Sequence, residues 1–301
     1  MIDSLLDGAE RATGAVAVID VFRAFTAAAV ALANGASRIA MVGTVEEALA
    51  LRASGAARVC IGEVRGRRPD GFDFGNSPSE LLGVDLRGAA VAQRTGAGTQ
   101  GIGAARRAEH LYAASLVTAG ATARALRAGA PAWVTLVAMG DNTVVRTDED
   151  ELCALHLRNP LEGRAGDPEA VRRVVLAGRE AARFRDPAFP HLPPGDLDVA
   201  PDHAVQSSAV ARADRLGRVR QVDHPVPAAA VNGAPARAGV DGLHAAVRLA
   251  LQREAGVRQR AGLAFGGTWP ADLRPTRTGL PERPRRLARR VRHQLRCWPN
   301  P

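Results

Sequence analysis

Three acidic residues of this chain directly follow short apolar runs, and a fourth apolar run ends in a glycine-rich turn. The acids are Asp20 after Ala17-Val18-Ile19, Glu63 after Cys60-Ile61-Gly62 and Asp141 after Ala138-Met139-Gly140, and the turn is Thr95–Gly101 after Val91-Ala92-Gln93. In an open α/β sheet, ligands bind beyond the carboxyl ends of the strands. Carboxylates there suit Mg²⁺, and glycine N–H groups suit oxyanions. The pattern predicts a site for an anionic ligand, with ordinary strand-end acids as the alternative.

Short polar side chains are also gathered in Gly71-Phe72-Asp73-Phe74-Gly75-Asn76-Ser77-Pro78. Glycine and proline around Asp73, Asn76 and Ser77 indicate a fixed, exposed loop that presents polar groups. The amide of Asn76 and the hydroxyl of Ser77 can donate hydrogen bonds to an oxyanion. An ordinary tight turn is the alternative.

The segment Gly96-Ala97-Gly98-Thr99-Gln100-Gly101 has the Gly-x-Gly-x-x-Gly spacing of a dinucleotide-binding loop. A ribose-binding acid should follow about 20 residues later, but residues 115–124 contain no acid. The Lys of a P-loop is also missing. N–H donors at a helix N-terminus remain, beside the hydroxyls of Thr95 and Thr99, and they predict a site for one phosphate or sulfonate. Glycines needed only for strand–helix packing are the alternative.

Asp20-Val21-Phe22-Arg23 places a carboxylate and a guanidinium three residues apart at a strand-to-helix turn. A carboxylate for a metal and an arginine for a phosphate are a usual combination in phosphoryl transfer. A phosphatase of the haloacid dehalogenase type would need Asp-x-Asp, and Phe22 occupies the second acidic position. A helix cap and a surface ion pair are the alternative roles of Asp20 and Arg23.

Four consecutive acids follow Thr147 and open an expected helix: Asp148, Glu149, Asp150 and Glu151. Thr-x-x-Asp is typical of a capping box, and acids in a first turn interact favourably with the helix dipole. Four acids exceed what capping requires, so Glu149 or Asp150 is a further candidate metal ligand. Capping alone is the alternative.

Apolar runs alternate with stretches of helical periodicity through most of the chain. The expected pairs are Ala15–Ile19 with Thr26–Asn34, Val45–Ala53 with Arg58–Ile61, Ala89–Gln93 with Ile102–His110, and Trp133–Ala138 with Glu151–Arg158. A helix over Asp167–Phe184 follows, with Asp167 as N-cap and Pro168 at the first helical position. This alternation predicts an α/β protein with three layers, α/β/α, around a mainly parallel sheet.

The net charge of +9 is concentrated at one end of the 301-residue chain. Residues 236–301 hold fourteen arginines against four acids, so they carry +10 and residues 1–235 carry −1. We expect an α/β body over 1–235, of one or two subdomains, and an Arg-rich, largely disordered extension over 236–301. Amphipathic spacing within the extension leaves an anionic membrane or nucleic acid as its alternative partner.

Neither a secretory leader nor an apolar run of about 18 residues is present, so no membrane association of the body is expected. Cys60, Cys153 and Cys297 are too few and too far apart for a disulfide framework. We expect a cytoplasmic protein with free thiols, either a monomer or a homodimer.

Together these segments resemble the family of 2-phosphosulfolactate phosphatases. The resemblance covers about residues 15–225, and its most specific part is Gly71–Pro78; the other matching stretches are Val18–Thr26, Ala33–Ala36, Gly62-Glu63, Thr95–Thr99 and Glu149–Ala154. It implies a Mg²⁺-dependent phosphatase on an α/β fold that removes phosphate from a small sulfonated carboxylate in coenzyme M biosynthesis. The family usually has Thr-Thr-Asn-Gly-Thr where this chain has Thr95-Gly96-Ala97-Gly98-Thr99, so an Asn side chain and a hydroxyl are missing from this loop.

The resemblance and the strand-end pattern select the same residues. The implied catalytic residues are Asp20, Arg23, Glu63, Asn76 and Ser77, and the implied Mg²⁺ ligands are Asp20, Glu63 and Asp150. The phosphate-binding residues are expected to be Thr95, Gly96, Gly98 and Thr99. Arg65, Arg67 and Arg68 lie near Glu63 in sequence, and Arg65 is the candidate to meet a carboxylate or sulfonate of the substrate. Water, an Asp or a Ser can each be the nucleophile. Two other classes stay open: a non-catalytic binder of small phosphorylated or sulfonated acids, and a nucleic-acid-associated protein that binds through residues 236–301.

Overall fold

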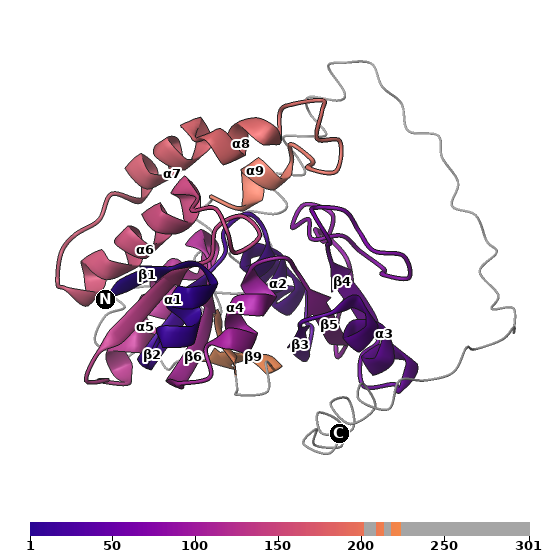
Figure 1. Ribbon diagram of the computed structural model, residues 1–301, viewed down its shortest axis with the longest axis horizontal. Coiled ribbons are helices and arrows are strands. Elements are labelled where there is room, and N and C mark those ends of the chain that lie inside the picture. Colours follow the sequence, from indigo (N-terminus) through magenta and orange to yellow (C-terminus); the bar gives the residue numbers. More distant parts are fainter. Residues whose placement is uncertain (202–208, 214–217, 224–301) are drawn as a thin grey trace, which may run out of the picture. The chain divides into compact units, whose positions relative to one another are not determined.

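A central sheet runs through the residues that the computed structural model describes, which are 1–201, 209–213 and 218–223 (Figure 1). Its strands are β1 (Ile2–Ser4), β2 (Gly14–Ile19), β3 (Arg38–Val42), β4 (Val59–Gly62), β5 (Ala90–Arg94), β6 (Ala108–Ala114), β7 (Val134–Ala138), β8 (Ala209–Ala213) and β9 (Arg218–Asp223). Their order across the sheet is β1-β7-β2-β6-β8-β9-β3-β5-β4. All described residues belong to one compact unit, Met1–His244.

Two parallel parts of the sheet are joined by an antiparallel hairpin. One part is β1-β7-β2-β6, in which Ile19 of β2 lies opposite Ala114 of β6 and Ala138 of β7. The other is β3-β5-β4. The hairpin β8–β9 pairs with β6 on one side and with β3 on the other. The mainly parallel sheet predicted from the sequence is therefore confirmed.

Helices cover both faces of this sheet. They are α1 (Leu5–Arg11), α2 (Ala24–Ala33), α3 (Val45–Ala53), α4 (Gly98–Ala104), α5 (Ala119–Ala128), α6 (Asp148–Leu161), α7 (Pro168–Ala177), α8 (Arg179–Arg183) and α9 (Asp196–Val199), with a 3₁₀ turn at Leu116–Thr118. Val16 and Val18 of β2 pack in one apolar cluster with residues of α1, α2 and α4, whereas Ala17 and Ile19 pack in another with residues of α5 and α6. Because alternate residues of a strand point to opposite faces, this division confirms the three-layer α/β/α architecture.

Local signals fixed some helix ends. The helix over Val45–Ala53 has the predicted bounds, and its N-cap Thr44 accepts a hydrogen bond from Glu47 N–H at 3.1 Å. Asp167 caps α7 as predicted, because its carboxylate accepts the Ala170 N–H at 2.9 Å. The single helix predicted over Asp167–Phe184 is wrong, since Gly178 is extended and separates α7 from α8.

The helix predicted over Ile102–His110 is also wrong in its second half. The helix α4 ends at Ala104, and Ala108–His110 already belong to β6. This strand, Ala-Glu-His-Leu-Tyr-Ala-Ala, is rich in alanine and lacks the β-branched residues that mark strands in sequence. Its pairing with β2 and β8, rather than its local propensity, makes it a strand.

Residues 236–301 lie outside the described residues, so the extension stays a prediction. Within the described part of the chain, no helix has the length and apolar character required to cross a membrane.

Candidate active site

Asp20 lies at the carboxyl end of β2, and two backbone donors hold its carboxylate. Ala24 N–H donates to Oδ1 and Gly98 N–H donates to Oδ2, each at 2.9 Å. A Cβ atom on Gly98 would lie 2.8 Å from Oδ2, so only glycine allows α4 to approach the carboxylate this closely. Burial raises the pKa of Asp20 to about 6, and the nearby charge of Glu63 adds to the rise.

Glu63 lies at the carboxyl end of β4 and is held in the same way. Gly66 N–H donates to Oε2 at 2.5 Å, and Gly96 N–H donates to Oε1. The N–H groups of Gly96 and Gly98, which the sequence predicts to bind phosphate, are thus bonded to carboxylates. The glycine loop brings the ends of β2, β4 and β5 to one place, although four strands separate β2 from β5 in the sheet.

Thr95 and Thr99, the other predicted residues of this loop, bond to each other. Thr95 N–H donates to Thr99 Oγ1 at 2.9 Å, and Thr99 N–H donates to Thr95 Oγ1 at 3.1 Å. Both side chains are buried, and neither lines the cavity described below. Their bonds fix the turn that carries Gly96 and Gly98.

Arg23 follows the same turn as Asp20 and is almost completely buried, with 4% of its surface exposed. Nη1 donates to Asp196 Oδ2 at 3.0 Å and to the His191 carbonyl at 3.4 Å, and Nη2 donates to the Gly66 carbonyl at 3.4 Å. The guanidinium also lies over the ring of Phe184, 5.8 Å from its centroid. A guanidinium has five N–H donors, so Nε and Nη2 each keep one N–H without a protein acceptor among the described residues.

The first turn of α6 brings two further buried acids to this edge of the sheet. Asp150 accepts the Val21 N–H at 2.8 Å and the Gly140 N–H at 2.9 Å, and it does not line the cavity. Glu149 does line it. Burial raises the pKa of Glu149 to about 8, helped by the charges of Glu180 and Asp20. The structure thus places Asp150, the predicted metal ligand, behind Asp20, and it places Glu149 at the cavity.

The capping box predicted at the start of α6 is wrong. Thr147 is at the N-cap position, but its side chain makes no capping bond. The turn is instead attached to the segments that follow β2 and β7, because the Asp150 carboxylate accepts hydrogen bonds from Val21 N–H and Gly140 N–H.

The segment Gly71–Pro78 divides its polar side chains among three places. Asp73 accepts the Cys60 N–H at 2.7 Å and pairs with Arg52 at 3.0 Å, away from the cavity. Asn76 lines the cavity, and its buried Oδ1 has no hydrogen-bond partner in the described part of the protein. Ser77 is buried and donates to Asp196 Oδ1 at 2.6 Å. Of the three, only Asn76 is placed to contact a ligand directly.

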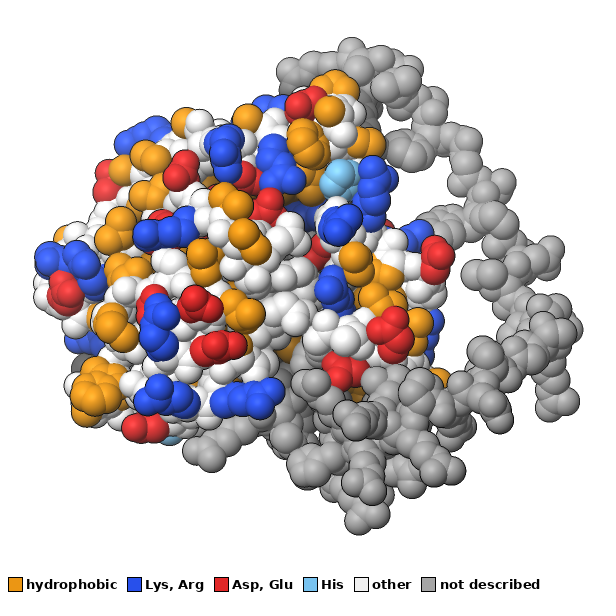
Figure 2. Space-filling view, in the orientation of Figure 1, with side chains coloured by type: hydrophobic (Ala, Val, Ile, Leu, Met, Phe, Trp, Pro, Cys, Tyr) orange, Lys and Arg blue, Asp and Glu red, His pale blue; other side chains and the backbone are white. Residues whose placement is uncertain are grey.

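These residues surround one cavity of about 500 Å³. Its acidic lining residues are Asp20, Glu63, Asp141, Glu149 and Glu180, and its basic lining residues are Arg23, Arg65, Arg183 and His191. Arg65 is exposed at the rim, where a small turn after β4 gives it a left-handed backbone with φ of 51°. Figure 2 shows basic side chains gathered around a histidine on this side of the molecule, with acidic side chains close by. The lining mixes both signs of charge and has an acidic excess.

Sequence reasoning missed the contribution of residues 184–200. This segment supplies Phe184, His191 and Asp196 to the site, and Phe184 also packs against Phe22 with ring centroids 5.1 Å apart. Its many prolines and turns gave no periodic pattern, although buried Leu192, Leu197 and Val199 anchor it. These apolar residues are the only feature of the segment's sequence that could have indicated an ordered structure.

No group of three or more His, Cys, Asp or Glu side chains within the described ranges is arranged to hold a metal ion by itself. Oxygen donors are nevertheless abundant. Asp20, Glu63 and Asn76 line the same cavity, and Asn76 Oδ1 is buried without a hydrogen-bond partner among the described residues. Mg²⁺ usually keeps several waters and takes only one or two carboxylates together with substrate phosphate oxygens, so this donor set fits it.

Known proteins share much of this chain. The 2-phosphosulpholactate phosphatase family matches residues 3–181. A probable 2-phosphosulfolactate phosphatase of Thermus thermophilus is 37% identical over 175 residues, which are 57% of this chain and 71% of that protein. Proteins with the same description from Bacillus subtilis and Gloeobacter violaceus are 32% and 38% identical over 161 residues, covering 52% of this chain and 69% and 67% of theirs.

Proposed function

The chain belongs to the 2-phosphosulpholactate phosphatase family, and we propose that it hydrolyses the phosphate ester of a small acidic metabolite, 2-phosphosulfolactate or a related phosphorylated hydroxy acid. The observation that carries this proposal is the cavity at the carboxyl edge of the sheet. It unites two carboxylates held by backbone N–H groups with a buried arginine that keeps free donors. A volume of about 500 Å³ suits a small metabolite.

We further propose that Mg²⁺ takes part, held by Asp20 and Glu63 and shared with the substrate. Asp20 and Glu63 lie in the same cavity and accept hydrogen bonds from backbone N–H groups rather than from an arginine, so an anionic substrate beside their ionised forms would be repelled without a cation. When bound, Mg²⁺ would polarise a phosphoryl oxygen and lower the pKa of an attacking water. The raised pKa of Asp20 fits the same account, because burial, together with the smaller effect of the nearby Glu63 charge, disfavours ionisation when no cation is present.

The chain's own residues then have distinct tasks. The Nε and Nη2 donors of Arg23 would bind phosphoryl oxygens in the buried part of the cavity, where hydrogen bonds to charge are strongest. Asn76 would contact the substrate beside them. Arg65, which lines the cavity and is exposed, would meet a second anionic group of the substrate, a carboxylate or sulfonate. The Gly96–Gly98 turn would orient Asp20 and Glu63, and Phe184 would exclude water from one side.

The proposal extends to the setting of the protein. Cys60 and Cys153 are free and buried, which agrees with a reducing, cytoplasmic location. We propose a monomer or a homodimer that needs neither a membrane nor nucleic acid for its activity.

A phosphate-release screen tests this function. The full-length protein is incubated with 2-phosphosulfolactate and a panel of phosphorylated hydroxy acids, with Mg²⁺ and with excess chelator. We expect release from a substrate that carries a second anionic group, and we expect the chelator to abolish it. Release that persists in chelator would overturn the metal assignment alone, and no release from any compound would overturn the enzyme assignment in favour of a non-catalytic binder.

A further inference from the structure

We propose that Asp196 is a positioning residue, which holds the Arg23 guanidinium in the orientation that receives the phosphoryl group. The inference rests on the proposed function, because it gives Arg23 an anionic ligand. It concerns a residue beyond 3–181, the part of the chain that the family matches.

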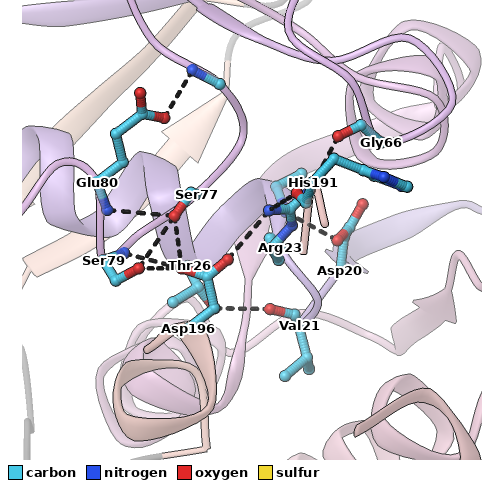
Figure 3. A network of polar contacts seen from close by, with 12 residues as sticks. Asp20, Val21, Arg23, Thr26, Gly66, Ser77, Ser79, Glu80, His191 and Asp196 are labelled. Atoms are coloured by element: carbon cyan, nitrogen blue, oxygen red, sulfur yellow. Dashed lines mark hydrogen bonds and ion pairs between the residues drawn. The ribbon is translucent and has the colours of Figure 1, made fainter. Parts of the chain in front are cut away.

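Asp196 is the most enclosed acid of the site, with none of its surface exposed. Its Oδ2 accepts Nη1 of Arg23 at 3.0 Å. Its Oδ1 accepts three hydrogen bonds: from Ser77 Oγ at 2.6 Å, from Ser79 Oγ at 2.6 Å and from Ser79 N–H at 3.0 Å. Figure 3 shows these residues converging on the carboxylate from both sides.

The two oxygens of the Asp196 carboxylate therefore have different partners. One oxygen is fixed to the loop that carries Ser77 and Ser79, and the other is left for the guanidinium. A buried carboxylate is costly unless its lone pairs are satisfied, and here each oxygen has partners. Asp196 therefore links three segments that are distant in sequence: the turn after β2, the loop after β4 and the start of α9.

The same geometry decides which side of Arg23 meets a ligand. Asp196 and the His191 carbonyl take Nη1, and the Gly66 carbonyl takes one donor of Nη2. The remaining N–H groups are on Nε and Nη2, and two such donors can bind two oxygens of one phosphate. Rotating the guanidinium would break the pair with Asp196, so the carboxylate holds these donors in place.

An opposite role is physically conceivable for the same contact. A carboxylate beside Arg23 offsets part of its positive charge and so weakens its attraction for an anion. If charge were decisive, Asp196→Asn would strengthen phosphate binding. If position is decisive, the variant weakens phosphate binding and slows turnover, because the asparagine amide can bond the serines but no longer pairs with the guanidinium.

The test is a double-mutant cycle on the full-length protein with Asp196→Asn, Arg23→Ala and both together. We expect Asp196→Asn to lower kcat/KM about 30-fold, within the range for loss of an electrostatic contact in a transition state, and Arg23→Ala to lower it by about 10²-fold. In the Arg23→Ala background, Asp196→Asn should change kcat/KM by less than about 3-fold, because it acts through Arg23. A damaged fold would not give this pattern, since its cost would persist in both backgrounds.

A milder variant and matched controls keep the test decisive if Asp196→Asn does not fold. Ser79→Ala removes one hydroxyl from Asp196 Oδ1 and should lower kcat/KM about 3-fold. Ser37→Ala removes a hydroxyl that bonds the Gly88 and Ala89 carbonyls, away from the site, and should leave activity unchanged. Asp85→Asn breaks an exposed Asp–Arg pair and is the charge-matched control.

A calorimetric titration with inorganic phosphate measures binding without turnover. We expect Asp196→Asn and Arg23→Ala to weaken phosphate binding, each by about 10-fold or more. If the wild type released no phosphate from any compound but its phosphate binding still depended on both residues, the proposed enzymatic activity would be wrong. The positioning role of Asp196 would then still stand. Normal or tighter phosphate binding by Asp196→Asn, or a loss of activity that Arg23→Ala does not mask, would overturn the inference.

Discussion

Acidic side chains occur in two contrasting regions of this protein, the cavity and the surface. In the cavity, burial raises the pKa of Asp20 to about 6 and that of Glu149 to about 8. On the surface, hydrogen bonds from Arg87 lower the pKa of Asp85 to about 2. The chemical group is nearly the same, so the difference comes from solvent and partners. It shows that the fold, rather than the residue type, decides which acids resist ionisation.

The acids of the two regions also differ in their hydrogen-bond and ion-pair partners. Asp85 pairs with an arginine on the surface, whereas Asp20 and Glu63 in the cavity are held by backbone N–H groups. Backbone donors fix the direction of a carboxylate without a full positive charge beside it. Asp20 and Glu63 therefore present oriented carboxylates to the cavity that have no bonded arginine in the described part of the chain, which favours a cation beside them.

The largest expected effect comes from removing one of these cavity acids. Asp20→Asn keeps the size of the side chain but removes its charge, and it leaves either Ala24 N–H or Gly98 N–H facing an amide N–H. We expect kcat to fall by about 10²-fold or more while the protein still folds. Phosphate release measures kcat, and circular dichroism checks that the variant is folded. Turnover close to that of the wild type would show that the Asp20 carboxylate does not take part in the reaction.

The sequence predicted the positions of these acids but not their surroundings. Strand-end logic placed Asp20 and Glu63 correctly at one edge of the sheet, because parallel strands share that edge. It could not distinguish Glu149 from Asp150 as the cavity residue. Both lie in the same helical turn, and only the packing of α6 decides which of them lines the cavity. It also misjudged Gly96 and Gly98, whose N–H partners are carboxylates contributed by other strands.

Asp196 shows a stronger limit of sequence reasoning. Its partners Arg23, Ser77 and Ser79 are more than 100 residues away along the chain. No local pattern marks a residue whose role comes only from long-range contacts. The overall α/β alternation was predictable because it depends on local periodicity, whereas β6 was missed because its neighbours in the sheet, rather than its composition, make it a strand.

An intermediate effect is expected from the pH dependence of stability, which tests the raised pKa of Glu149. Its folded-state pKa of about 8 lies above its ordinary value of 4.5. Between these values the folded state binds more protons than the unfolded state, so the free energy of unfolding falls as pH rises. We expect the wild-type Tm to fall from pH 5 to pH 8, measured without metal. Glu149→Gln, which mimics the protonated form, should make this decline shallower.

Asp20 and Asp150 also have raised pKa values, so part of the decline should persist in Glu149→Gln. Glu169→Gln, an exposed acid in the first turn of α7, is the matched control and should keep the wild-type slope. A decline in Glu149→Gln as steep as that of the wild type would contradict the raised pKa of Glu149, because His156 and His191, whose pKa values burial lowers, contribute the opposite slope equally in both proteins.

The smallest expected effect comes from the surface acid. Asp85→Asn removes the ion pair with Arg87, which joins Oδ2 to Nη2 at 2.8 Å, with 84% of the Arg87 side chain and 60% of the Asp85 side chain exposed. Water and salt screen such a pair, and other bonds already hold its loop: Leu86 N–H donates to the Asn34 carbonyl at 3.1 Å, and Gly88 N–H donates to the Gly35 carbonyl at 2.9 Å. We therefore expect Tm at pH 7 and phosphate release to stay within experimental error of the wild type. A clear loss of Tm that disappears at high salt would show that this surface pair does stabilise the fold, and the contrast between the two regions would then be one of degree.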